Sequence, residues 1–104
     1  MKITKDERSL LLFFETCAVD RAGKVDTRRM NDDDMKIGSA WNENDFVRFG
    51  RIKFTDISKP PSRLLPNYTH WCELSEEAWK EAHKERRARA ERMAKKITYE
   101  RISI

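Results

Sequence analysis

The sequence has few residues that turn or cross-link a chain, and it has no long hydrophobic run. Only three glycines, three prolines and two cysteines occur among its 104 residues. The longest apolar block, Leu10 to Phe14, is far shorter than the roughly 18 residues that a membrane-spanning helix needs. The first residues carry charges of both signs, and no small-residue cleavage site follows the apolar block, which does not fit a secretory signal peptide. We therefore expect a cytoplasmic protein with no membrane span.

Chemistry-bearing motifs are also scarce. Cys17 and Cys72 are too few for the disulfide framework of a small secreted domain, so we expect two free thiols. His70, Cys72 and His83 do not have the spacing of zinc ligands. The three acidic residues at positions 32–34 lack the pattern of a calcium loop and suit a helix start better. There is no glycine-rich phosphate loop and no nucleophile motif, so we expect no metal, no cofactor and no enzymatic activity.

Charge is what the sequence has in abundance. Charged residues make up 38% of the chain, and the net charge is +4. Residues 1–79 hold 13 Lys and Arg against 14 Asp and Glu, whereas residues 80–104 hold 9 against 4. The positive excess therefore lies at the carboxyl-terminal end, which favours an anionic partner.

Capping signals and apolar spacing predict two helices in the first half of the chain. Thr4 and Glu7 form a capping box before apolar residues spaced by three and four, which predicts a helix from Lys5 to about Val19. Residues 24–27 fit a very short strand. Asn31, followed by three aspartates, predicts a second helix that ends near Trp41.

The segment Asp45 to Ile57 is the most consequential prediction. Its apolar residues do not alternate as a strand requires, but at 100° per residue they gather in one arc of roughly 160°, which favours a helix. The opposite side of that helix is a polar stripe made of Asn44, Arg48, Arg51 and Thr55.

The second half of the chain predicts a wing-like hairpin and a long helix. Pro60 and Pro61 lie in a loop over residues 58–67, and residues 68–74 have the character of a short strand. Ser75 is a cap for a helix from Glu76 to about Lys96. We therefore predict a mainly α single domain with a small β-wing and a long carboxyl-terminal helix.

This order of elements resembles the winged helix-turn-helix family of bacterial and phage regulators. The resemblance places the supporting helix at 31–41, the recognition helix at 44–57 and the wing at 58–74, within a domain of residues 1–85 that a basic extension, 86–104, follows. It implies binding of double-stranded DNA, with the recognition helix in the major groove. Base contacts would then come from Asn44, Arg48, Arg51 and Thr55, and wing contacts to phosphates from Lys59 and Arg63.

Several interpretations stay open beside this one. The polar stripe also fits a solvated helix face, and the whole chain also fits a small interaction or inhibitor protein, such as a phage accessory protein. The cluster of Arg86, Arg87 and Arg89 fits phosphate or partner contacts, or ion pairs along its own helix. Trp41, Trp71 and Trp79 fit a base-stacking set, but their apolar settings favour the core. A homodimer could form through the apolar residues of the last helix, which are Trp79, Ala82, Ala90, Met93 and Ile97.

Overall fold

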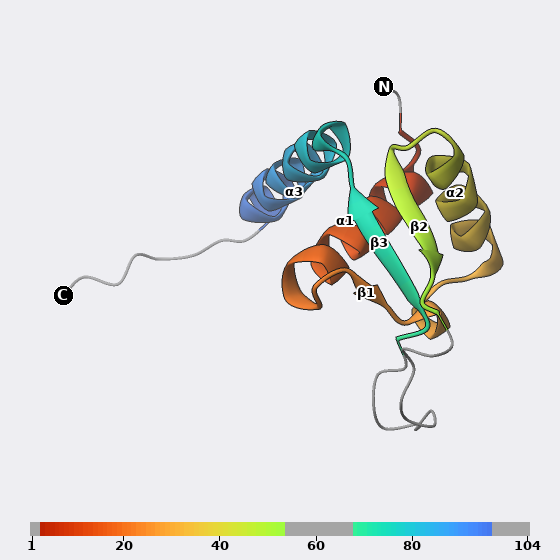
Figure 1. Cartoon of the computed structure of the whole chain (residues 1–104). Coiled ribbons are helices and arrows are strands. Elements are labelled where there is room, and N and C mark those ends of the chain that lie inside the picture. Colours follow the sequence, from red (N-terminus) through yellow and green to blue (C-terminus); the bar gives the residue numbers. More distant parts are fainter. Residues whose placement is uncertain (1–2, 54–67, 97–104) are drawn as a thin grey trace.

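The computed structural model describes residues 3–53 and 68–96, which form three α-helices and a three-stranded sheet (Figure 1). The elements in chain order are α1 (Lys5–Asp20), β1 (Lys24–Val25), a 3-10 turn (Thr27–Arg29), α2 (Asp32–Glu43), β2 (Val47–Arg51), β3 (His70–Leu74) and α3 (Glu76–Lys96). This confirms a mainly α protein with a small β component. No helix in the described ranges is long and apolar enough to cross a membrane.

The helices begin where their capping signals predict. Thr4 and Asn31 each form a capping box, in which the Glu7 and Asp34 carboxylates accept a hydrogen bond from the backbone N–H of the cap residue. The Ser75 hydroxyl accepts a hydrogen bond from the Ala78 N–H at 3.1 Å and so caps α3. Side chains that cap backbone N–H groups decide these boundaries, and these signals are local in the sequence.

The sheet is antiparallel throughout, with β3 in the centre between β1 and β2. One face packs against α1, which lies behind the strands in Figure 1. Phe14 of α1 meets the rings of Phe49 and Trp41, with centroids 5.4 and 6.3 Å apart. Cys17 and Cys72 are buried in the same core and are free, as expected.

The predicted helix over Asp45–Ile57 is wrong, because residues 47–51 form strand β2. Within the strand, Val47 and Phe49 are buried and alternate with exposed residues. Phe46 is also buried, but it lies in the turn after α2, where its N–H donates to Trp41 O and to the Asn44 side chain. Counting Phe46 and Ile52, which flank the strand on its two sides, as part of one element broke the alternation and favoured the false helical arc.

The strand has consequences for the predicted helix-turn-helix. Asn44 is the carboxyl-terminal cap of α2, and no recognition helix follows it in residues 45–53. Thr55, Lys59 and Arg63, and most of the predicted wing, lie outside the described residues. The strands predicted near residues 24–27 and 68–74 are present as β1 and β3. Helix α3 runs without a break through position 85, where we placed the domain boundary.

Candidate functional site

The face of the sheet that points away from α1 is covered by none of the described helices (Figure 1). Five residues from the three strands share this surface, which we call the open face: Lys24, Arg48, Gly50, Trp71 and Glu73. Trp71 lies at its centre, because it pairs with Lys24 on one side and with Gly50 on the other. The next residue along β3 on this face, Glu73, pairs with Arg48.

The indole ring of Trp71 lies across Gly50. A Cβ atom at position 50 would come within 3.1–3.2 Å of three indole atoms, so any larger residue would force the ring to shift from this position. Trp71 is nevertheless 38% exposed, which is unusual for so large an apolar side chain. The prediction that all three tryptophans belong to the core is therefore wrong for Trp71, whereas Trp41 is buried and Trp79 is half-buried against the core.

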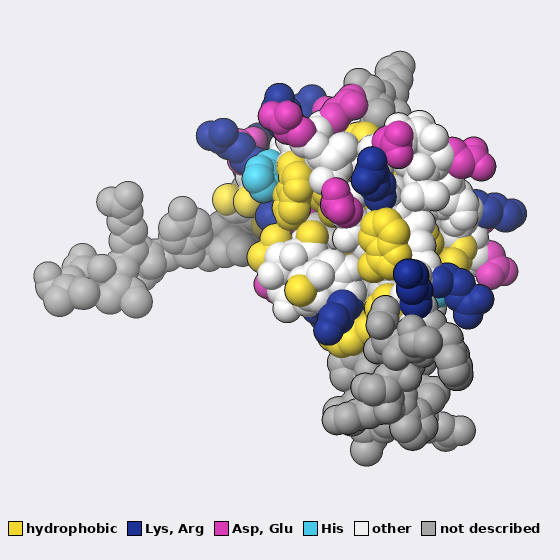
Figure 2. All heavy atoms as spheres, in the orientation of Figure 1, with side chains coloured by type: hydrophobic (Ala, Val, Ile, Leu, Met, Phe, Trp, Pro, Cys, Tyr) yellow, Lys and Arg dark blue, Asp and Glu magenta, His cyan; other side chains and the backbone are white. Residues whose placement is uncertain are grey.

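Positive side chains lie beside this exposed ring. Lys24 is its cross-strand neighbour and Arg48 is diagonal to it on β2. Figure 2 shows the resulting mixture on this side of the molecule, where dark blue side chains lie next to hydrophobic ones. Arg48 is partly balanced by Asp45, whose Oδ1 lies 3.8 Å from the Arg48 Nε, and both side chains are well exposed.

Arg51 and Arg48 lie on opposite faces of β2, although the predicted helix placed them on one side. They are three residues apart in a strand, and successive strand residues point to opposite faces, so the two side chains diverge. Arg51 instead pairs with His70. Burial lowers the pKa of His70, and the nearby positive charge of Arg51 lowers it further.

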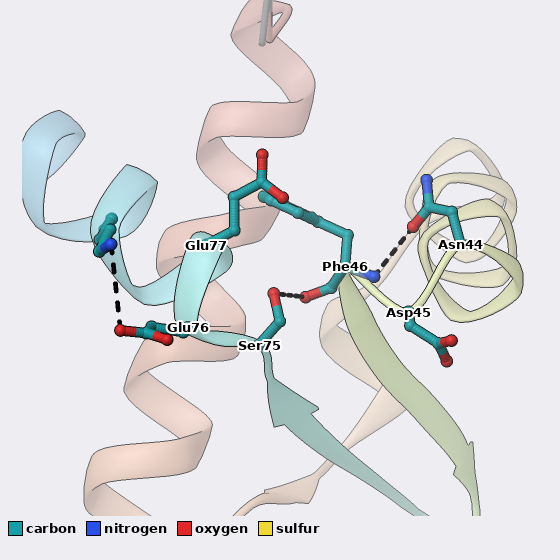
Figure 3. Close-up of a pocket in the computed structure, with 7 residues that line it drawn as sticks. Asn44, Asp45, Phe46, Ser75, Glu76 and Glu77 are labelled. Atoms are coloured by element: carbon teal, nitrogen blue, oxygen red, sulfur yellow. Dashed lines mark hydrogen bonds and ion pairs between the residues drawn. The ribbon is translucent and has the colours of Figure 1, made fainter.

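Asn44 is also separated from the open face. Its Oδ1 accepts a hydrogen bond from the Phe46 N–H at 2.9 Å, so the amide is used in the turn after α2. It borders a hollow of about 590 Å³ between the end of α2 and the start of α3 (Figure 3). Asp45, Glu76 and Glu77 line this hollow together with one cation, Lys80, which is 3.9 Å from Glu76. This acidic surface repels phosphate.

A second hollow adjoins Trp71. It has a volume of about 470 Å³ and lies between the end of α1, strand β3 and the first turns of α3. Trp71 and Trp79 both line it, together with Glu73 and small residues at and just after the end of α1. It is therefore continuous with the open face, and its lining is polar and apolar in similar measure.

Arg86 of α3 holds this helix to α1 through an ion pair, and two further arginines of α3 form ion pairs within the helix. Arg86 donates to the carboxylate of Glu15, which is only 4% exposed, and His83 lies 3.7 Å from the other Glu15 oxygen. Arg89 and Arg92 donate to Glu85 at 2.9 and 3.2 Å.

These hydrogen bonds act on the acidity of Glu85. Burial raises the pKa of Glu85, but the hydrogen bonds from the two arginines outweigh that effect and the net pKa is lowered. Of the three arginines predicted to contact a partner, Arg87 is the most exposed, at 86%, and it is 3.9 Å from Glu91.

Comparison of the chain with models of protein families, with curated proteins and with solved structures finds no match. In the part of the chain that the structure describes, no group of three or more His, Cys, Asp and Glu side chains is arranged to hold a metal ion. The open face is therefore the candidate site on its geometry alone. The sequence signal for it is the spacing of two residues, which places Arg48 and Gly50 on one face of β2 and Trp71 and Glu73 on the same face of β3.

Proposed function

We propose that this protein binds single-stranded nucleic acid on the open face of its sheet, in the cytoplasm, as a binding protein rather than an enzyme. The observation that carries the proposal is the half-exposed Trp71, which lies across Gly50 with Lys24 and Arg48 on its two sides. Trp71 would stack on one base, and the two cations would contact the flanking phosphates.

Elementary physical chemistry supports this pairing of groups. An aromatic side chain that stacks on a base contributes about 1–3 kcal/mol, whatever the base, because every base has a π-face. Cations beside the ring attract the phosphates that precede and follow that base. In a duplex the base faces are already stacked on one another, so an indole on an open sheet does not reach them. The double-stranded DNA expected from the sequence depended on a helix that residues 45–53 do not form.

The test is the affinity for a fluorescently labelled eight-nucleotide oligothymidine, measured by anisotropy at low salt. Trp71→Ala should weaken binding by about 5- to 150-fold, which is the stacking energy converted at 1.4 kcal/mol per tenfold. Trp71→Phe should retain most of the affinity, because a phenyl ring still stacks. Val19→Ala is the matched control, since Val19 is an exposed apolar residue of α1 outside the open face.

Two outcomes would replace the proposal. If a 20-base-pair duplex binds more tightly than the oligothymidine and binding does not depend on Trp71, double-stranded DNA is the ligand after all. If neither nucleic acid binds, the alternative from the sequence, a protein-interaction or inhibitor module, takes its place.

A further inference from the structure

The hollow next to Trp71 is lined by further side chains that take no part in the proposed stacking of a base on Trp71. Two tryptophans line it, Trp71 from β3 and Trp79 from α3, together with Leu74. The ring of His83 packs against that of Trp79, with centroids 6.0 Å apart. The hollow of about 470 Å³ falls within the size range of small-ligand sites, and its mixed lining offers both apolar contacts and polar groups that fix orientation.

Glu73 is the acidic side chain among the residues that line this hollow. It is exposed, and it forms no ion pair with another residue of the described segments; Arg48, which is opposite in register, has its ion pair with Asp45. An ionised carboxylate only accepts hydrogen bonds, and its two oxygens can accept from two parallel N–H groups. Glu73 therefore favours a ligand edge with two adjacent donors.

Among the bases, only guanine presents such an edge. Its Watson–Crick edge carries N1–H beside the N2 amino group, and both donate. Adenine and cytosine place a ring nitrogen acceptor beside their amino group, and thymine has one N–H between two carbonyl oxygens, so each would set an acceptor against the carboxylate. Unstacked bases of single strands are commonly recognised by this combination of aromatic stacking and edge hydrogen bonds.

We propose that the hollow between Trp71 and Trp79 holds a guanine base, whose N1–H and N2–H groups donate to the Glu73 carboxylate. This inference rests on the proposed binding of single-stranded nucleic acid. It adds base preference to that function, because Trp71 alone would not distinguish between bases.

The experiment compares an eight-nucleotide oligothymidine with the same oligonucleotide carrying one central guanosine or one central inosine, which lacks the N2 amino group. The wild-type protein should prefer the guanosine oligonucleotide about tenfold, within the range of a good bidentate contact, and the inosine oligonucleotide should lie between the two. Glu73→Gln should remove the preference and leave binding of the oligothymidine at least as tight as before. Glu77→Gln, which removes an equal charge at the start of α3, should retain the preference.

Failure of this inference is distinguishable from failure of the proposed function. Equal affinity of the wild-type protein for the three oligonucleotides, or an unchanged preference in Glu73→Gln, would overturn guanine recognition while single-strand binding stands. The absence of binding to all three would overturn both.

Discussion

At the scale of single residues, two glycines determine how close neighbouring groups come to β3. Gly23 has φ = +82°, and a Cβ atom there would be 2.8 Å from the backbone oxygen of Cys72. Gly50 needs no unusual φ, but a Cβ atom there would press on the indole of Trp71. The first neighbour is a rigid backbone atom and the second is a side chain, so alanine at the two positions should have different costs.

We expect Gly23→Ala to lower the free energy of unfolding by about 1–3 kcal/mol, because it combines a strained φ with a clash against backbone. Gly50→Ala should cost less stability, since the indole can shift, but it should weaken oligonucleotide binding by displacing the ring. Urea unfolding measures the first effect and anisotropy the second. Equal stability of Gly23→Ala and the wild-type protein would contradict the close approach of Gly23 to Cys72.

His70 makes stability depend on pH. Its pKa lies below the ordinary value of 6.5, because burial and then the charge of Arg51 disfavour the protonated ring. The unfolded chain therefore binds a proton more readily, and the stability that His70 contributes is full above pH 6.5 and is lost as pH falls through the lower folded pKa.

We expect Arg51→Gln to raise the pKa of His70 towards 6.5, since it removes the second of the two causes. An NMR titration of the His70 ring measures the shift. Lys53→Gln removes a charge two residues further along the chain and serves as the comparison. A larger shift in that variant than in Arg51→Gln would show that Arg51 is not the neighbouring charge.

At the scale of elements, the sequence predicts the helices well and the sheet only in part. The helices have local caps and long apolar stripes, so α1, α2 and α3 begin at the predicted residues and end within about two residues of them. Strand β2 has only five residues, and its hydrogen-bond partner β3 lies beyond residues 54–67. Such pairing leaves little local signal, and the flanking residues Phe46 and Ile52 obscured the two-residue alternation of the strand.

For the same reason, the sequence predicts only part of the candidate site. Arg48 was identified from the sequence, but its neighbours Trp71 and Lys24 come from two other strands, and only the register brings them together. Trp71 looked like a core residue because it is a large aromatic side chain next to Cys72, but the buried face of β3 carries Cys72 and Leu74. Which face of a sheet is left uncovered depends on where α1 packs, and no local pattern shows that.

The contact between α1 and α3 depends on the buried carboxylate of Glu15. Arg86→Ala would leave that carboxylate without its strongest partner, and its second oxygen already has no hydrogen bond among the described residues. We expect a loss of about 2 kcal/mol, which is less than for a fully buried pair because Arg86 is half-exposed. Arg87→Ala should cost under about 0.5 kcal/mol, as an exposed pair does. Thermal or urea unfolding compares the two variants, and similar losses would show that Glu15 does not need Arg86.

At the scale of the whole molecule, the apolar residues available for a homodimer are fewer than the sequence indicates. Ala82 is fully buried within the chain and Trp79 packs against the same core, so the first half of the predicted dimer stripe is already used. Met93 remains 55% exposed, and Ile97 lies outside the described residues. A dimer through α3 stays a prediction, and light scattering of the wild-type protein and Met93→Glu tests it.

Charge is distributed unevenly over the surface, and this sets the salt dependence of binding. The hollow at the start of α3 is acidic, and most arginines near the α1 contact are paired with carboxylates, so few cations remain for phosphates. On the open face these are Lys24 and Arg48. Each phosphate contact with a single strand contributes about −0.7 to the slope of log affinity against log salt concentration.

We therefore expect a slope of about −1.4 for the oligothymidine, since two contacts each contribute about −0.7. Lys24→Gln and Arg48→Gln should each reduce its magnitude by about half. Lys80→Gln, at the acidic hollow, should leave the slope unchanged, because its ammonium pairs with Glu76 and lies away from the open face. A slope several times steeper would require many more phosphate contacts than this face offers, and it would place the nucleic acid elsewhere on the chain.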